Sequence, residues 1–159
     1  MNPSSEAVTS YWQAFREAVR GERPNLPEQP PDAWQFGDSA ELADSLATLV
    51  LAGTKTATAG LLWEYEAEGV AVPGAGTLEI VLDSRDEPVC VIEYTEVEVV
   101  PFEQVTAEFA ALEGEGDRTL EWWRDAHWRY FSRRCEVFGK TPALDMPVVC
   151  EQFRVVWLG

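Results

Sequence analysis

Histidine and cysteine are scarce in this sequence. One histidine, His127, is present among 159 residues, which argues against the several imidazole ligands of a typical zinc centre. The three cysteines, Cys90, Cys135 and Cys150, are odd in number and include no Cys-x-x-Cys pair. This pattern predicts free, mostly buried thiols in a protein of the reducing cytosol, and it disfavours a disulfide framework.

Long apolar runs are also absent. No stretch approaches the roughly 18 consecutive apolar residues of a membrane-spanning helix. Residues 1–20 carry Glu6, Arg16 and Glu17, which are not expected in a secretory signal. The sequence therefore predicts a cytoplasmic protein without a membrane partner. A length of 159 residues with 46% apolar composition is sufficient for one domain with a substantial core.

Basic residues are few and unevenly placed. The chain has 12 of them against 28 acidic residues, which gives a formal charge of −16. Such a chain repels polyphosphate at long range, so a DNA-coating role and a double-stranded DNA partner are disfavoured. Between Thr56 and Asp117 the only basic residue is Arg85. Six basic residues then follow between Arg118 and Lys140, and this local concentration is a candidate binding surface.

Hydrophobic periodicity predicts a mixed order of helices and strands. Helices are expected over 5–20, from Asp38 to Gly53, over 61–68, from Pro101, and over 119–138; strands are expected over 77–83, 88–100 and 148–157. Residues 24–31 hold four prolines and predict an extended connector. The strands are joined mostly by hairpins and long connections, which favours an α+β fold with a small bent β-barrel or sheet flanked by helices.

The segment Gly53-Thr54-Lys55-Thr56-Ala57-Thr58 is the first candidate site. Gly53 is placed to end the preceding helix in a left-handed conformation. An ammonium bracketed by hydroxyls can cradle an anion, and a lysine with a depressed pKa can activate a hydroxyl nucleophile. The structural alternative is that Lys55 complements the helix dipole while the threonines simply favour a strand.

An acidic loop, Glu113-Gly-Glu-Gly-Asp117, is the second candidate. Its glycines allow carboxylates to approach one another, an arrangement suited to acid–base chemistry or to a hard divalent cation such as Mg²⁺ or Mn²⁺. Glu113, Glu115 and Asp117 are the ligands this reading supplies. A flexible acidic turn between two helices explains the same residues without a function.

The helix after this loop has two distinct faces. Apolar residues and His127 share one arc, so His127 is expected to line the core or a pocket. The opposite arc carries a basic stripe interrupted by a tryptophan: Arg118, Trp122, Arg129, Arg133 and Lys140. Cations with an interleaved aromatic suit single-stranded nucleic acid. Ordinary surface ion pairing with Asp125 and Glu136 is the alternative.

Three segments in this order resemble the bacterial ASCH-domain family: FGDSAELADSLATLVLAGTKTATAGLLWEYE, VEVVPFEQVTAEFAALEGEGDRTLEWWRDAHWRYF and MPVVCEQFRVVW. The resemblance covers roughly residues 34–157. It implies a PUA-like domain over 34–159, preceded by an N-terminal helix and connector over 1–33. It also implies a cleft that receives RNA or a modified pyrimidine nucleoside.

The family signature G-x-K-x-x-T falls on Gly53, Lys55 and Thr58. In its small members, amidohydrolases that deacetylate N4-acetylcytidine, the lysine and threonine act with a glutamate, which corresponds to Glu115. A longer member is a ribonuclease for single-stranded RNA that also depends on the lysine. This chain departs from the amidohydrolases at Thr54 and Gly60, where they carry arginines.

The residues and the resemblance together predict a hydrolase that cleaves single-stranded RNA, and the absence of arginine at Thr54 and Gly60 favours this function. An amidohydrolase and a binding module are the alternatives. A ribonuclease would use Lys55 as counter-charge and Glu115 as acid–base group, with Gly53, Thr56 and the basic stripe binding the strand. An amidohydrolase would use Lys55 to deprotonate Thr58 and Glu115 to protonate the leaving amine. A binding module would recognise a modified base without chemistry.

Overall fold

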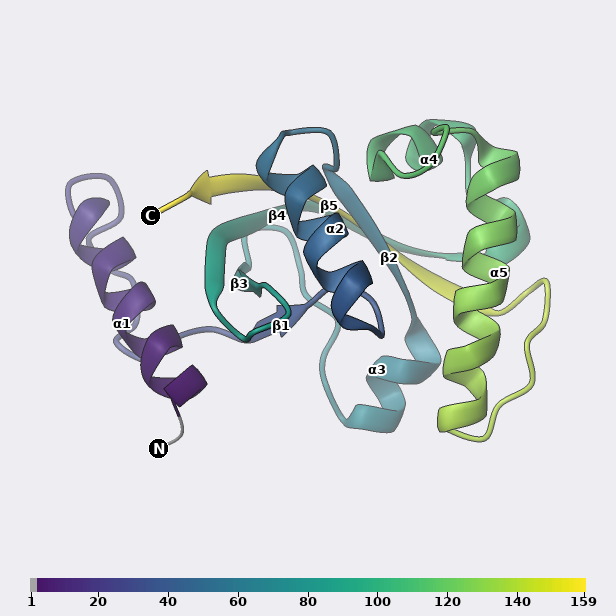
Figure 1. Ribbon diagram of the computed structural model, residues 1–159, viewed down its shortest axis with the longest axis horizontal. Coiled ribbons are helices and arrows are strands. Elements are labelled where there is room, and N and C mark those ends of the chain that lie inside the picture. The colour runs from purple at the N-terminus through teal and green to yellow at the C-terminus, as the bar shows by residue number, and fades with distance from the viewer. Residues whose placement is uncertain (1–2) are drawn as a thin grey trace. The chain divides into compact units, whose positions relative to one another are not determined.

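The computed structural model describes residues 3–159 (Figure 1). The chain divides into two compact units. The first contains the chain up to Ala52, Thr77–Glu93 and Arg154–Gly159, and the second contains Gly53–Gly76 and Tyr94–Phe153. The strands hydrogen-bond in the order β1-β3-β4-β5-β2. Among the described residues, no helix combines the length and apolar character required to cross a membrane.

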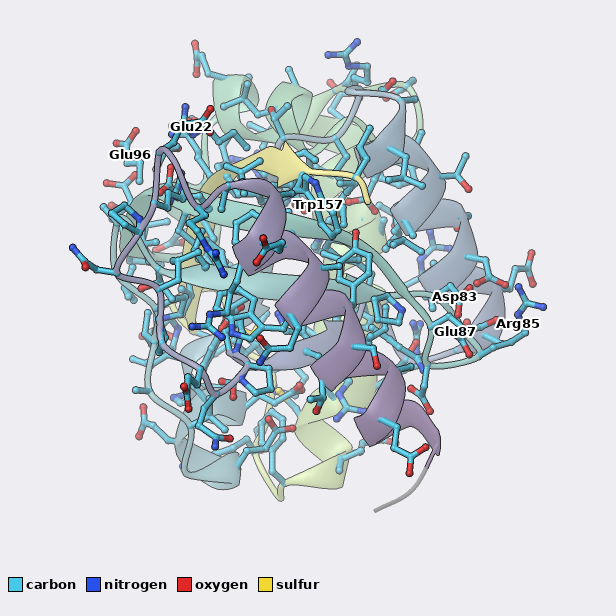
Figure 2. The ribbon with its side chains drawn as sticks, turned by 90° about the vertical axis from the view of Figure 1, so that its left-hand side faces the viewer. Glu22, Asp83, Arg85, Glu87, Glu96 and Trp157 are labelled. Atoms are coloured by element: carbon cyan, nitrogen blue, oxygen red, sulfur yellow. The ribbon has the colours of Figure 1, made fainter. Side chains whose placement is uncertain are left out.

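The first unit packs two helices with short strands. Its elements are α1 (Pro3–Ala18), β1 (Ala33–Gln35), α2 (Ala40–Leu51), β3 (Leu78–Leu82) and the beginning of β4 (Pro88–Pro101). Strand β1 runs parallel to β3, and β3 runs antiparallel to β4. Trp12 and Phe15 of α1 pack with Ile80 and Val91 in its core. Trp157 lies against α1, with its ring 5.0 Å from that of Tyr11 (Figure 2).

The ends of α2 correct one expectation and confirm another. The helix was expected to begin at Asp38, but Ser39 is the N-cap and its Oγ accepts the Leu42 amide hydrogen. A serine oxygen in extended backbone reaches that amide as well as a carboxylate would. Gly53 has the expected left-handed backbone, with φ of 80°. The most buried face carries alanines rather than leucines: Ala43 and Ala47, with Val50.

The turn between β3 and β4 is acidic and hydrogen-bonded. The Asp83 carboxylate accepts from the backbone amides of Arg85 and Glu87 (Figure 2). Near the start of strand β4, Cys90, Val91 and Ile92 are all fully buried. Buried and exposed residues therefore do not alternate in the first half of this strand, because both faces are covered there, and the exposed acids appear only in its second half.

The second unit holds both candidate segments. Its elements are β2 (Ala57–Leu61), α3 (Leu62–Glu68), the remainder of β4, a 3-10 turn (Phe102–Gln104), α4 (Ala107–Glu113), α5 (Leu120–Val137) and most of β5 (Pro147–Trp157). Strand β2 pairs antiparallel with β5. The core joins Ala57 and Leu61 of β2 to Trp123 and Phe131 of α5, as the apolar arc of that helix predicted.

Helix α4 begins later than expected. A helix was predicted from Pro101, but the strand continues to that residue, which has extended backbone with ψ of 145°. The helix begins only after Thr106, whose side chain accepts from the Phe109 amide. It then leads through the acidic loop into α5 beside it (Figure 1). The predicted α+β class is confirmed, and the three cysteines are free and buried as predicted.

Candidate functional site

Lys55 is buried at the entrance to β2. Its side chain is 1% exposed, and its ammonium donates to Glu113 Oε1 at 2.9 Å and to Glu115 Oε2 at 2.8 Å. Lys55 is therefore not a solvated cation at a helix end. Burial alone lowers the pKa of Lys55, but the two carboxylates outweigh it and raise the pKa above its ordinary value. The lysine is a fixed positive charge.

The lysine segment and the acidic loop are joined through their backbones. The Thr56 amide and hydroxyl both donate to the Leu112 carbonyl, at 2.9 Å and 3.3 Å. Gly114 ends α4 with φ of 70° and packs so closely that a Cβ there would lie 2.3 Å from the Thr54 carbonyl oxygen. Only glycine combines this conformation with this approach. The turn places Glu113 and Glu115 on either side of it within reach of Lys55.

Glu113 lies in a buried cluster with Lys55, Glu115 and His127. Besides Lys55, it accepts a hydrogen bond from Trp123 Nε1 and lies 3.1 Å from His127 Nε2. Burial raises the pKa of this carboxyl, but Lys55 and His127 reverse the effect and hold the pKa well below its usual range. Glu113 is therefore ionised and structural. The sequence offered it only as a metal ligand in the acidic loop.

His127 has hydrogen-bond acceptors on both ring nitrogens. Nδ1 lies 2.9 Å from the Trp123 carbonyl oxygen, and Nε2 faces the Glu113 carboxylate. Because neither partner can donate when Glu113 is ionised, both nitrogens must carry hydrogen, and the ring is an imidazolium. Burial lowers the pKa of His127, but Glu113 more than offsets this and raises it. The ring stacks on Trp123 at 4.1 Å.

The raised pKa of His127 predicts a stability that declines in alkali. A group whose pKa is higher in the folded than in the unfolded state stabilises the fold fully at pH below its unfolded pKa, here 6.5. This stabilisation is lost as pH rises through the folded pKa. The free energy of unfolding should therefore fall as pH rises above 6.5. Urea denaturation across pH tests this, with the isolated imidazole signal followed by NMR. In His127→Gln the free energy of unfolding should fall less steeply with pH, and an unchanged slope would contradict this prediction.

Glu115 is the accessible acid of the cluster. Its side chain is 14% exposed, against 1% for Lys55 and Glu113. Burial and the neighbouring Glu113 charge raise the pKa of Glu115, although Lys55 opposes them. The pKa values of two carboxyls in the same loop are thus shifted in opposite directions. Such a separation assigns the fixed negative charge to Glu113 and the proton donor to Glu115.

Glu113, Glu115 and His127 also form a group with metal-ligand chemistry. One ligand atom from each lies within 4.8 Å of the others. The Lys55 ammonium bonds to both carboxylates of this group and supplies the positive charge that a cation would bring. Asp117, the third ligand expected from the sequence, instead accepts from the Thr119 amide and hydroxyl at the start of α5.

Thr58 is the second residue of β2 and is half-buried. Ala57 and Ala59 face the core beneath α4 and α5, so Thr58 points to the other face of the strand. Its partner across the strand pair is Glu151 of β5. The expected partnership between Lys55 and Thr58 stays a prediction. Gly53 and Thr56, expected to bind substrate, form the turn and the Leu112 contact described above.

The cations of the basic stripe are exposed; Arg118 precedes α5 and Lys140 follows it. The Arg118 guanidinium donates to the Ala111 carbonyl at the end of α4. Trp122 is half-buried over Gly116, and Arg129 pairs with Asp125 at 3.0 Å. The Arg133 guanidinium lies 5.5 Å from the Tyr130 ring centre. The stripe begins beside the cluster, because the Arg118 amide donates to the Glu115 carbonyl at 3.0 Å.

Glu151 was not among the site residues predicted from the sequence. It is 2% exposed and accepts a hydrogen bond from the Tyr65 hydroxyl of α3. Its strand is rich in valine, so the segment was interpreted as a core strand. A single acid at an inward position of such a strand is the signal that was available.

The family model of the ASCH domain matches residues 32–157. A crystal structure of protein EF3133 from Enterococcus faecalis V583, of the family DUF984, is 36% identical with a TM-score of 0.86, covering 96% of this chain and 90% of that one. The ASCH domain from Lactobacillus crispatus JV V101 is 33% identical with a TM-score of 0.81, covering 99% and 96%. No curated protein matches the chain.

Proposed function

Because the chain belongs to the ASCH-domain family and has its PUA-like, RNA-binding type of fold, we propose that it hydrolyses the amide of an acylated cytosine-type nucleoside, either free or within single-stranded RNA. The observation that carries the proposal is the state of Glu115. It is the partly exposed carboxyl of a buried cluster, and its pKa is raised. A carboxyl of this kind is suited to protonate a leaving amine.

The charge balance of the cluster supports an uncharged reacting group. Lys55 is 1% exposed and already bonded to two carboxylates, so a phosphate would have to compete with both for its ammonium. The formal charge of −16 adds a general repulsion of polyanions. A neutral amide on a nucleoside base avoids both costs.

The roles follow the family motif where this sequence matches it. Thr58 supplies the nucleophilic hydroxyl, which bonds to the acyl carbon while the carbon–nitrogen bond breaks. Glu115 gives its proton to the departing amine, and water then hydrolyses the threonine ester. Lys55 holds Glu115 in place through its 2.8 Å contact and adds a fixed positive charge.

Cleavage of single-stranded RNA at the same cluster is the second candidate. It is favoured by the exposed arginines of α5, Arg129 and Arg133, and by Trp122 of the same stripe, whose ring packs on Gly116 of the acidic loop. This surface would guide a strand by its phosphates and stack one base. The same surface also suits an acylated cytidine presented within an RNA strand.

One set of incubations separates these functions. The protein is given N4-acetylcytidine, a single-stranded RNA containing that base, and the unmodified RNA, with chromatography for cytidine and gels for strand length. The amide proposal expects cytidine from the first two substrates and intact strands throughout. Shortened unmodified RNA that depends on Lys55 would favour the ribonuclease, and tight binding without turnover would leave a binding module.

A further inference from the structure

A second buried acid, Glu151, lies on the Thr58 face of β2. Glu151 of β5 is directly opposite Thr58 in the antiparallel register. Side chains of directly opposite residues share a face, with Cβ atoms about 5 Å apart. Glu151 is 2% exposed and holds a hydrogen bond from the Tyr65 hydroxyl. A buried carboxylate therefore stands within side-chain reach of the threonine hydroxyl.

Tyr65 fixes where this carboxylate lies. Gly60 is the next residue after Thr58 on that face of β2, and a Cβ there would meet Tyr65 Cε2 at 3.4 Å and its hydroxyl oxygen at 3.8 Å. The tyrosine thus lies over Gly60 and directs its hydroxyl to Glu151 beside Thr58. Its ring occupies the space into which a side chain at position 60 would project.

Lys55 is a poor acceptor for the Thr58 proton. Its ammonium is 1% exposed and donates to Glu113 and Glu115, so the lone pair that a base needs is absent. The Glu151 carboxylate accepts a hydrogen bond from the Tyr65 hydroxyl, and a carboxylate can accept up to about four hydrogen bonds. A hydroxyl directly across the strand pair is well placed to donate one of them.

We propose that Glu151 is the general base that activates Thr58, with Tyr65 as its positioning residue; the inference rests on the proposed role of Thr58 as nucleophile. The Thr58 proton passes to the Glu151 carboxylate as Oγ1 bonds to the acyl carbon. The carbon–nitrogen bond breaks, and the amine takes its proton from Glu115. Water then attacks the ester and gives a proton to Glu115, while Glu151 returns its proton to Thr58.

An activated ester tests this step apart from the natural substrate. Wild-type protein incubated with p-nitrophenyl acetate should release p-nitrophenolate and carry acetyl on Thr58, as seen by peptide mass spectrometry. Glu151→Gln should slow acetylation about 100-fold or more and remove the loss of rate at acidic pH. Tyr65→Phe should cause a smaller fall, about tenfold, because the carboxylate remains but loses its position.

Controls keep the outcome clear. Glu98→Gln removes an exposed carboxylate from β4 and should acetylate Thr58 at the wild-type rate, while Thr58→Val should lose the adduct. Circular dichroism melting checks that each variant folds. Acetylation of Thr58 in Glu151→Gln at the wild-type rate overturns the inference, as does a wild type that never labels Thr58. Labelling of Thr58 without deacetylation of N4-acetylcytidine would instead contradict only the proposed substrate.

Discussion

Replacing Lys55 by methionine is expected to lower the free energy of unfolding by about 3–5 kcal/mol, because it leaves buried carboxylate charge without its main partner. Glu113 and Lys55 are each 1% exposed, so water cannot take over the lost contact. Methionine has a similar length and leaves little empty volume, so the loss is electrostatic. Urea denaturation followed by tryptophan fluorescence at neutral pH measures it.

A second substitution separates lost charge from lost packing. Lys55→Met combined with Glu113→Gln removes both charges and should recover part of the stability, since a neutral amide is far less costly to bury than an unpaired carboxylate. Lys140→Met, which removes an exposed lysine beyond α5, should change stability by about 0.5 kcal/mol or less. Equal stability of Lys55→Met and wild type would refute the buried ion-pair description.

The partners of Lys55 were only partly predictable from the sequence. Its meeting with Glu115 was implied by the family motif. The contribution of Glu113 was not, because 58 residues separate it from Lys55 and an acid beside a glycine resembles any acidic turn. The contact depends on how closely Gly114 packs on the Thr54 carbonyl, and that depends on tertiary structure.

The chemical state of His127 was beyond sequence reasoning for a similar reason. Its place among aromatic residues on α5 correctly predicted burial, since helical spacing sets which face meets the core. Its charge depends on the two acceptors at its ring nitrogens, and one of them belongs to another helix. Periodicity identifies a buried face, but it does not identify the groups on the opposing surface.

Strand pairing explains why Glu151 was overlooked while Thr58 was found. Thr58 lies in a motif of fixed local spacing, whereas its cross-strand neighbour is fixed by the register between β2 and β5, whose paired residues lie about ninety positions apart. The predicted starts of α2 and α4 were also wrong, for a local reason. Ser39 and Thr106 cap α2 and α4, and several nearby residues had comparable capping ability.

Replacing Glu115 by glutamine is expected to lower the turnover number on N4-acetylcytidine by about 100- to 10,000-fold, the range for loss of a general acid. KM should change little, because glutamine keeps the shape of the side chain and can still accept from Lys55. In the wild type, turnover should fall as pH rises through the raised pKa of Glu115, since the acid must be protonated to donate. The residual activity of Glu115→Gln should lack that decline.

Glu115→Gln is expected to raise the stability of the protein at pH 8 although it lowers the activity. Because the folded pKa of Glu115 lies above its ordinary value of 4.5, the folded protein holds this proton more tightly than the unfolded chain. Its stability therefore declines as pH rises from 4.5 through the folded pKa. Glu115→Gln does not titrate, so it should match the wild type near pH 4 and exceed it at pH 8 in urea denaturation. A variant that loses activity and also loses stability at pH 8 would identify Glu115 as a structural partner of Lys55, and the proposed proton donor would then have to be sought elsewhere.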